Sequence, residues 1–181
     1  VPVSVVVKTD TATAGTATNA YERITVKADA ATFVRLSDAT SGALSTKQID
    51  VTGTGTAALF GFAAENFKNV TTIDATASGG ATITGATSAG GLLSGNTVLS
   101  SFKGGAGADS LDVSNMTAAQ LQAFTAGNLD GGSGGVDTLI VGTGAATGLT
   151  GNVNNSGFDT LSISALSGTV DFGKFGSGIT T

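Results

Sequence analysis

The sequence lacks cysteine, histidine and tryptophan altogether, and it has one proline, one methionine and one tyrosine. Without cysteine the chain can form neither disulfide bonds nor thiolate metal sites. Without histidine it lacks the commonest zinc ligand and the side chain that most often serves as a general base near neutral pH. These absences remove most hydrolase triads from consideration, and we expect that the chain is not an enzyme.

Glycine is abundant, at 28 of 181 residues, and threonine, alanine and valine supply much of the rest. Strands accept threonine and valine readily, and glycine suits tight turns. The composition therefore predicts an all-β protein with many short strands and no long helix.

No segment has the form of a signal peptide or of a membrane span. The apolar opening from Val1 to Val7 ends at Lys8, far short of membrane thickness. Because the sequence does not start with methionine, we expect it to be a piece of a longer protein.

Negative charge is concentrated in the second half of the chain. Residues 1–103 carry seven basic and seven acidic side chains, whereas residues 104–181 carry one lysine and six aspartates, so the net charge of −5 lies entirely in that half. Carboxylates with few cations nearby favour the binding of divalent cations, although a merely solubilising acidic face has the same composition. Such a surface argues against nucleic acid as a partner, since its binders need a basic surface.

Two glycine-rich stretches in the acidic half each lead through one aspartate into an apolar segment. They are Gly104-Gly105-Ala106-Gly107-Ala108-Asp109-Ser110-Leu111 and, starting 27 residues later, Gly131-Gly132-Ser133-Gly134-Gly135-Val136-Asp137-Thr138-Leu139. This is the order of the calcium nonapeptide of β-roll proteins, in which glycines turn the backbone so that carbonyl oxygens converge, and the aspartate supplies negative charge. The second copy has one extra residue before Asp137. The alternative interpretation is a pair of ordinary surface turns.

Calcium is the cofactor that these stretches predict. We expect Asp109 and Asp137 to be the main carboxylate ligands, with Asp112 and Asp130 as reserves. Because a calcium ion takes about six to eight oxygens, one turn cannot complete a site, and the two turns must lie in adjacent layers. Main-chain carbonyls are expected from Ala106 and Ser133, and the backbone geometry from Gly104, Gly105, Gly107, Gly131, Gly132 and Gly134.

Strand-like segments recur at a spacing typical of stacked repeats. Their aligned aliphatic residues, separated by 25, 24, 38, 28 and 22 positions, are Ile24, Ile49, Ile73, Leu111, Leu139 and Leu161. This spacing predicts a parallel β-solenoid, like a β-roll or β-helix, with aliphatic residues inside and glycine at the corners. The step of 38 contains two further strand candidates, residues 81–84 and 97–100, and is consistent with two short coils.

Residues 1–60 lack the glycine–aspartate signal, so their topology stays open at this point. The predicted strands there run from Val3 to Lys8, from Tyr21 to Ala28 and from Thr32 to Leu36. They fit either the first coils of the solenoid or a separate small β domain such as an antiparallel sandwich. We assign residues 61–181 to the calcium-binding solenoid.

One short helix is predicted near residues 117–126. Thr117-Ala118-Ala119-Gln120 has the form of a capping box, and Leu121 and Phe124 share one face of the helix. Gly127 can close the helix in a left-handed conformation. We expect this helix to cover the core between the two glycine-rich turns.

The stretches from Gly104 to Val113 and from Gly131 to Val141, followed by Ser156-Gly157-Phe158-Asp159-Thr160-Leu161-Ser162-Ile163, resemble the calcium-binding part of RTX-type surface-layer proteins of Gram-negative bacteria. In that family a Gly-Phe-Glu-Thr-Leu string commonly follows such motifs. The likeness covers about residues 98–165, and the motifs depart from a strict tandem array. It implies secretion by a type I route, folding on meeting extracellular calcium, and self-assembly into a two-dimensional lattice.

The resemblance predicts a structural protein of a bacterial cell surface. Its partners would be further copies of itself and, as a second candidate, a surface glycan. An RTX-type secreted adhesin is an alternative, although an aromatic content of 6% offers few platforms for sugars. A calcium-dependent polysaccharide lyase or epimerase is a second alternative, but it needs a base or acid beside its carboxylates, and beyond residue 103 the chain offers Lys174 alone.

Overall fold

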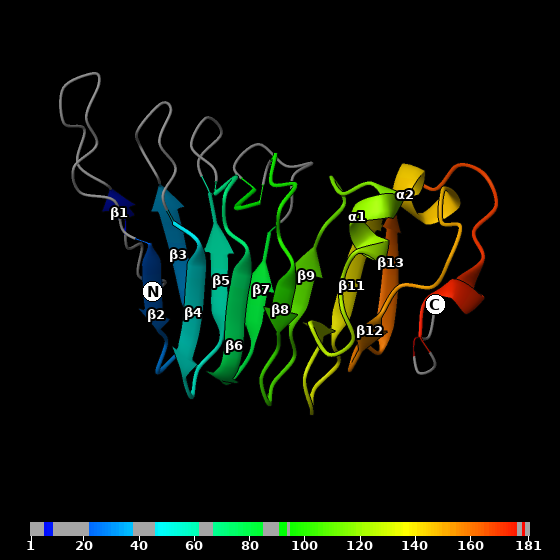
Figure 1. Cartoon of the computed structure of the whole chain (residues 1–181). Helices are drawn as coiled ribbons and strands as arrows, with labels where there is room; N and C mark the ends of the chain where they lie inside the picture. The colour runs from blue at the N-terminus through cyan, green and yellow to red at the C-terminus, as the bar shows by residue number, and fades with distance from the viewer. Residues whose placement is uncertain are drawn as a thin grey trace, which may run out of the picture.

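The computed structural model describes residues 6–8, 22–37, 46–61, 67–84, 91–93, 95–176 and 179, and these residues form two sheets through which the chain passes alternately (Figure 1). The seven-stranded sheet contains, in spatial order, β1 (Val6–Lys8), β3 (Thr32–Ser37), β5 (Ala57–Phe60), β7 (Ala81–Ile83), β9 (Ser110–Asp112), β11 (Thr138–Gly142) and β13 (Thr160–Ser164). The six-stranded sheet contains β2 (Arg23–Lys27), β4 (Gln48–Gly53), β6 (Thr72–Ser78), β8 (Ser101–Lys103), β10 (Leu129–Asp130) and β12 (Asn155–Ser156).

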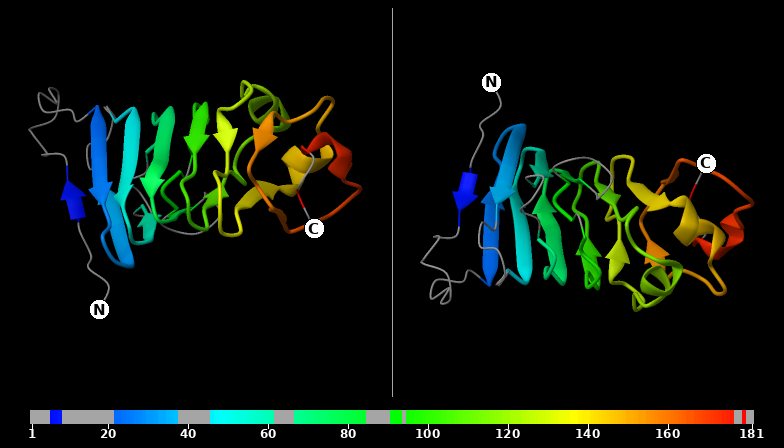
Figure 2. Two further views of the ribbon diagram at one scale, coloured as in Figure 1. Left: turned by 90° about the horizontal axis from the view of Figure 1, so that it is seen from below. Right: turned by 90° about the horizontal axis from the view of Figure 1, so that it is seen from above.

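The described strands build a parallel β-solenoid, as the sequence predicts. Every strand pair among the described residues is parallel, and from β2 to β12 the chain makes about five turns. Figure 2 shows the coils following one another along the long axis, from the end that holds β1 to the end that holds β12 and β13. The pairs β4–β6 and β5–β7 carry both sheets across residue 60 without a break. An antiparallel sandwich is therefore absent from the described part of residues 1–60.

The solenoid interior is built from two apolar rows rather than one. In the six-stranded sheet the row in register is Ile24, Ile49, Ile73, Phe102 and Leu129. In the seven-stranded sheet it is Val34, Leu59, Ile83, Leu111, Leu139 and Leu161. All of these side chains are buried. They alternate with outward residues because successive side chains of a strand point to opposite faces.

The sequence-based alignment was correct in register within each sheet but wrong in joining the two rows. Ile24, Ile49 and Ile73 do stack, and so do Leu111, Leu139 and Leu161, but the two triplets lie in different sheets. Each coil holds two strands with the same alternation of apolar and polar residues, so the pattern alone does not tell them apart. The apparent step of 38 residues crosses from one sheet to the other. The predicted strand at residues 81–84 is β7, whereas residues 97–100 precede β8 and are not a strand.

Within the described ranges, two short helices and one 3₁₀ turn lie outside the sheets. The predicted helix is α1 (Ala118–Gln122), and its capping box is present, since Thr117 and Gln120 bond each other's main-chain N–H groups. Gly127 has a left-handed φ of +78°, but the helix ends earlier, with Ala123 at its C-cap. A second helix, α2 (Thr143–Thr147), was missed because Gly142 at its N-cap provides no side-chain cap that a sequence pattern could reveal. The 3₁₀ turn η1 (Phe172–Lys174) lies near the C-terminus.

The inward row makes a direct prediction about stability. Leu139 is fully buried in the row of the seven-stranded sheet, between Leu111 and Leu161. We expect Leu139→Ala to lower the free energy of unfolding by about 2–5 kcal/mol, because it leaves a cavity in the packed interior. The matched control is Ile140→Ala, since Ile140 is the next residue, points outward and is partly exposed. That change should cost about 1 kcal/mol or less in a denaturant titration. Equal losses for the two variants would contradict the assigned register.

Candidate functional site

The two glycine-rich stretches form turns that lie in adjacent coils. Residues 104–109 connect β8 to β9, and residues 131–137 connect β10 to β11. Because β8 pairs with β10 and β9 pairs with β11, the two turns stack directly on each other. They belong to the row of tight turns along the lower edge of the solenoid in Figure 1. The adjacency that the sequence predicts is therefore present.

Glycine is required in these turns because main chain meets main chain. A Cβ atom added to Gly107 would lie 1.7 Å from the carbonyl oxygen of Gly79, and one added to Gly104 would lie 1.9 Å from that of Gly131. Real Cβ atoms never approach backbone so closely. These positions therefore require glycine because successive turns stack closely, whereas the predicted role of the glycines in a metal site stays a prediction.

Three aspartates bond the coils together at the ends of the turns. Oδ1 of Asp109 accepts a hydrogen bond from the main-chain N–H of Ala81 at 2.6 Å. The N–H of Asp109 donates to Oδ1 of Asp137 at 2.7 Å, and the N–H of Asp137 donates to Oδ2 of Asp159 at 2.9 Å. These residues occupy the same register position in successive coils. We call Asp109, Asp137 and Asp159 the aspartate ladder.

The aspartate ladder replaces a main-chain bond that the earlier coils make. In those coils the equivalent N–H groups bond to carbonyl oxygens of the next turn, Thr32 to Thr56 at 2.8 Å and Ala57 to Gly80 at 2.9 Å. From Ala81 onward a carboxylate oxygen takes the place of the carbonyl. A buried N–H group must have a partner, so the aspartates satisfy donors that the glycine-rich turns would otherwise leave unpaired.

Asp109 is committed to the backbone through both of its oxygens. Oδ2 accepts the N–H of Gly105 at 2.9 Å and so closes its own turn, while Oδ1 bonds to the preceding coil. Its exposed fraction is 1%, and that of Asp137 is also 1%. Each carboxylate oxygen has a second lone pair, so these bonds do not by themselves prevent a cation from sharing the same oxygen.

Burial makes these two carboxylates difficult to ionise. It raises the pKa of Asp109 to about 6, in spite of the hydrogen bonds from Gly105 and Ala81, and the neighbouring charge of Asp137 adds to the increase. Burial also raises the pKa of Asp137, with further contributions from Asp159 and Asp130, and the N–H of Asp109 opposes the shift. Neither Asp109 nor Asp137 forms an ion pair with a described cation.

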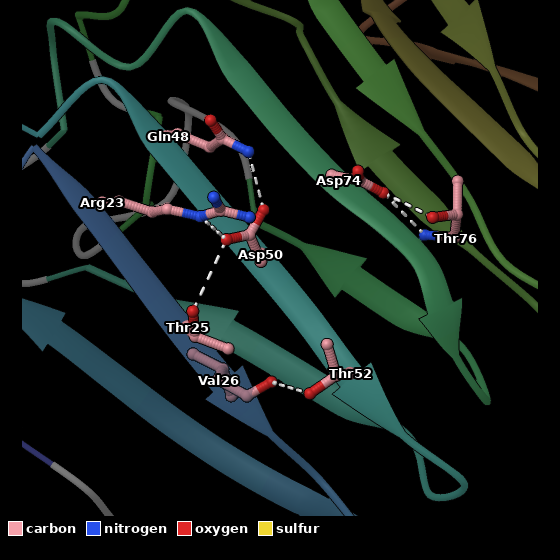
Figure 3. Close-up of polar contacts among 8 residues, drawn as sticks. All are labelled: Arg23, Thr25, Val26, Gln48, Asp50, Thr52, Asp74 and Thr76. Carbon is pink, nitrogen blue, oxygen red and sulfur yellow. Dashed lines mark hydrogen bonds and ion pairs between the residues drawn. The ribbon is translucent and has the colours of Figure 1, made fainter.

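Asp50 shows how the same fold accommodates a buried carboxylate that does have a cation. It lies on the six-stranded sheet with an exposed fraction of 5%, and Figure 3 shows the Arg23 guanidinium and the Gln48 amide directed at it. Burial alone would raise the pKa of Asp50, but the bonds from Arg23 and Gln48 outweigh burial and hold it below its usual value. The contrast indicates that positive charge is what Asp109 and Asp137 lack.

The other predicted ligands lie in different places. Asp130 is close to the turns, and its Oδ1 accepts the N–H of Gly132 at 3.2 Å. Asp112 lies at the opposite end of β9 from Asp109 and accepts the N–H of Ser114 at 2.9 Å, so it does not join them. Ala106 and Ser133 both lie in the stacked turns, where the N–H of Ser133 donates to the carbonyl oxygen of Gly105 at 2.9 Å.

Sequence reasoning did not assign Asp159 to the site. The signal was available, because the three ladder positions share one pattern of glycine, any residue, aspartate, serine or threonine, and leucine. It occurs at residues 107–111, 135–139 and 157–161. Aligned on this pattern, the extra residue of the second stretch falls within the turn and leaves the spacing from Gly135 to Leu139 unchanged.

The oxygen atoms at the stacked turns belong to carboxylates and main-chain carbonyl groups, and these are the types of ligand that a hard cation binds. Within the described ranges, no group of three or more histidine, cysteine, aspartate or glutamate side chains is placed to hold a metal ion. A calcium ion at these turns would therefore depend on main-chain oxygens for most of its ligands. This is the division of ligands that the glycine-rich pattern predicts.

Comparison with known proteins does not assign the chain to a family. No protein-family model matches it, and neither the curated proteins nor the solved structures include a significant match. Among the described residues, no helix combines the length and apolar character needed to cross a membrane.

The aspartate ladder predicts that Asp109 is important for stability even without metal. We expect Asp109→Ala to leave the N–H groups of Ala81 and Gly105 without partners, each at a cost of about 1–3 kcal/mol. Asp171→Ala is the control, since Asp171 is exposed and its carboxylate accepts one N–H bond, from Gly173. Thermal melting in the presence of a chelator should show a much larger loss for the first variant. Similar melting temperatures for the two variants would argue against the ladder.

The raised pKa of Asp109 also predicts the direction of a pH effect. Between its ordinary value of 3.8 and about 6, the folded chain binds more protons at this site than the unfolded chain does. The contribution of Asp109 to the free energy of unfolding is therefore greatest at low pH and declines as the pH rises through this window. We expect the difference between the parent and Asp109→Asn, measured in chelator by denaturant titration, to decrease from about pH 4 to about pH 6 and then level off. An increase over that range would contradict the burial-driven shift.

Proposed function

We propose that this chain is a structural, non-catalytic module of a bacterial surface layer, in which bound calcium completes the stacking of the glycine–aspartate turns. The observation that carries the proposal is a pair of buried carboxylates, Asp109 and Asp137, in stacked glycine-rich turns. Neither carboxylate forms an ion pair with a described cationic side chain. Two ionised groups in such a position repel each other and lose hydration. A divalent cation relieves both costs.

The residues that would hold calcium are those of the two stacked turns. Asp109 and Asp137 would supply carboxylate oxygens, and the main chain around Ala106 and Ser133 would supply carbonyl oxygens. Bound calcium would provide positive charge and additional bonds between coils. Because metal that binds only the folded state adds to its stability, calcium would then act as a switch for folding.

A structural role fits the distribution of side chains better than a catalytic one. Asp109 and Asp137 are buried and bonded to backbone, so neither faces a substrate. The solenoid also offers long, regular faces from strands held in register, which suits repeated contact between copies. Extracellular calcium and self-assembly into a lattice come from the resemblance to RTX-type surface-layer proteins, and they remain part of the proposal.

The proposal predicts that calcium raises the melting temperature and lowers the pKa of Asp109 and Asp137. The purified chain should melt at a higher temperature in millimolar calcium than in excess chelator, and magnesium at equal concentration should have a smaller effect, since it prefers a rigid octahedral shell. In the double variant Asp109→Asn and Asp137→Asn the effect of calcium should disappear. The matched control, Asp112→Asn, should keep it, because Asp112 lies at the other end of its strand.

Electron microscopy then tests the assembly separately from metal binding. Ordered sheets that form on adding calcium to the parent protein, and not to the double variant, are the expected result. Calcium-dependent stability without sheets would retain the metal site and reject the lattice. An unchanged melting temperature in calcium and in chelator would reject the metal site itself.

A further inference from the structure

The last strand of the six-stranded sheet has a polar residue at the inward position where the other strands have an apolar one. Its inward row contains Ile24, Ile49, Ile73, Phe102 and Leu129, and the next position in register is Asn155. An amide in an apolar row adds nothing to packing and requires hydrogen bonds of its own. Oδ1 of Asn155 accepts the N–H of Gly176 at 3.0 Å, and the residue remains partly exposed. Departures from local design rules are expected where a protein binds something.

A pocket of about 280 Å³ opens beside Asn155. One wall is residues 152–156, which lead into and through β12, and another is residues 126–127 of the preceding coil. The third wall is residues 173–176, which fold over the end of the solenoid, where the N–H of Val153 donates to the carbonyl oxygen of Lys174 at 2.8 Å and Phe175 is buried. The pocket thus lies where the solenoid interior ends, and a main-chain hydrogen bond joins two of its walls.

The polar side chains that line this pocket are three amides, one hydroxyl and one ammonium group, from Asn152, Asn154, Asn155, Ser156 and Lys174. Two of them are held in place, because Nδ2 of Asn154 donates to the carbonyl oxygen of Phe124 at 2.8 Å and Nζ of Lys174 donates to that of Leu149. The side chains of Asn152 and Ser156 make no hydrogen bond within the described part of the chain. Donors and acceptors are therefore available at the pocket surface.

This set of groups indicates the class of ligand. An amide presents one acceptor and two donors side by side, which matches the adjacent hydroxyl groups of a sugar ring. None of the described residues that line the pocket carries a carboxylate, and five of them have polar side chains, which favours a polar organic ligand over a metal ion or a lipid chain. A single ammonium is too little positive charge for a polyanion.

We propose that the pocket formed by residues 126–127 and 152–156 together with Gly173, Lys174 and Gly176 binds one pyranose unit of a saccharide. Asn155 and Asn152 would bond adjacent hydroxyl groups, and Lys174 would add a donor. This assignment does not depend on calcium or on assembly into a lattice. It gives the end of the solenoid a binding role that is separate from the role of the glycine–aspartate turns.

Saturation-transfer NMR on the intact chain tests the assignment. The probes are glucose, galactose, mannose, N-acetylglucosamine and glucuronate, together with short oligosaccharides of each, all measured in calcium and again in chelator. We expect at least one of them to receive saturation and to be displaced by excess of the same sugar. Binding in both conditions would support the pocket whether or not the proposed metal site exists.

Three variants distinguish a loss of sugar binding from a loss of folding. Asn155→Leu removes the acceptor of the Gly176 N–H but continues the apolar row, so these two effects on the melting temperature offset each other and the variant should stay folded, while its sugar affinity falls by about tenfold or more. Asn152→Ala changes an exposed side chain and should lower affinity with an unchanged melting temperature. Thr82→Ala, on the outer face of the seven-stranded sheet, is the control and should bind like the parent. No saturation of any sugar by the parent, or equal binding by all three variants, would overturn the assignment.

Discussion

The acidic half of this solenoid depends on hydrogen bonds that main-chain N–H groups donate to aspartate carboxylate oxygens one coil away. Parallel coils can stack closely only if each turn satisfies the donors that it buries. In the early coils a carbonyl oxygen of the next turn does so, at Thr32 and Ala57. Where the turns become rich in glycine, the ladder formed by Asp109, Asp137 and Asp159 takes over. The glycines bring the backbones together, and the aspartates supply the bonds.

Burying the carboxylates of Asp109 and Asp137 has an electrostatic cost, because neither has a cationic side chain beside it to offset its charge among the described residues. Asp50 shows that a buried carboxylate in this fold can be matched by an arginine, and its pKa is held low as a result. Asp109 and Asp137 have hydrogen bonds but no cationic partner among the described residues, and burial raises the pKa of each. A site that holds negative charge in good geometry but without compensation is suited to a divalent ion. The structural role that we propose follows from that imbalance, because the ion would control when adjacent coils lock together.

Sequence reasoning reached the class of fold and the centre of the candidate site because both have local signals. The alternation within strands and the spacing of aliphatic residues predicted a parallel solenoid, and the glycine stretches predicted two stacked turns. The division into two rows could not be obtained, since strands of the two sheets carry the same pattern. Helix α2 has no side-chain cap, and so left no signal. The separation of Asp112 from Asp109 depends on where β9 begins, and the exchange of a carbonyl for a carboxylate at Ala81 depends on three-dimensional register, so neither could be read from residue types.

Amide hydrogen exchange followed by NMR tests the aspartate ladder most directly. If carboxylate oxygens hold these N–H groups, from the neighbouring coil at Ala81, Asp109 and Asp137 and from within the same turn at Gly105, their amides exchange as slowly as amides inside the seven-stranded sheet, such as that of Leu139. In Asp109→Ala, protection is then lost at Ala81 and Gly105 while Leu139 keeps most of its own. Rapid exchange of these four amides in the intact chain, at rates like those of exposed turns, would show that the coils are not joined in this way.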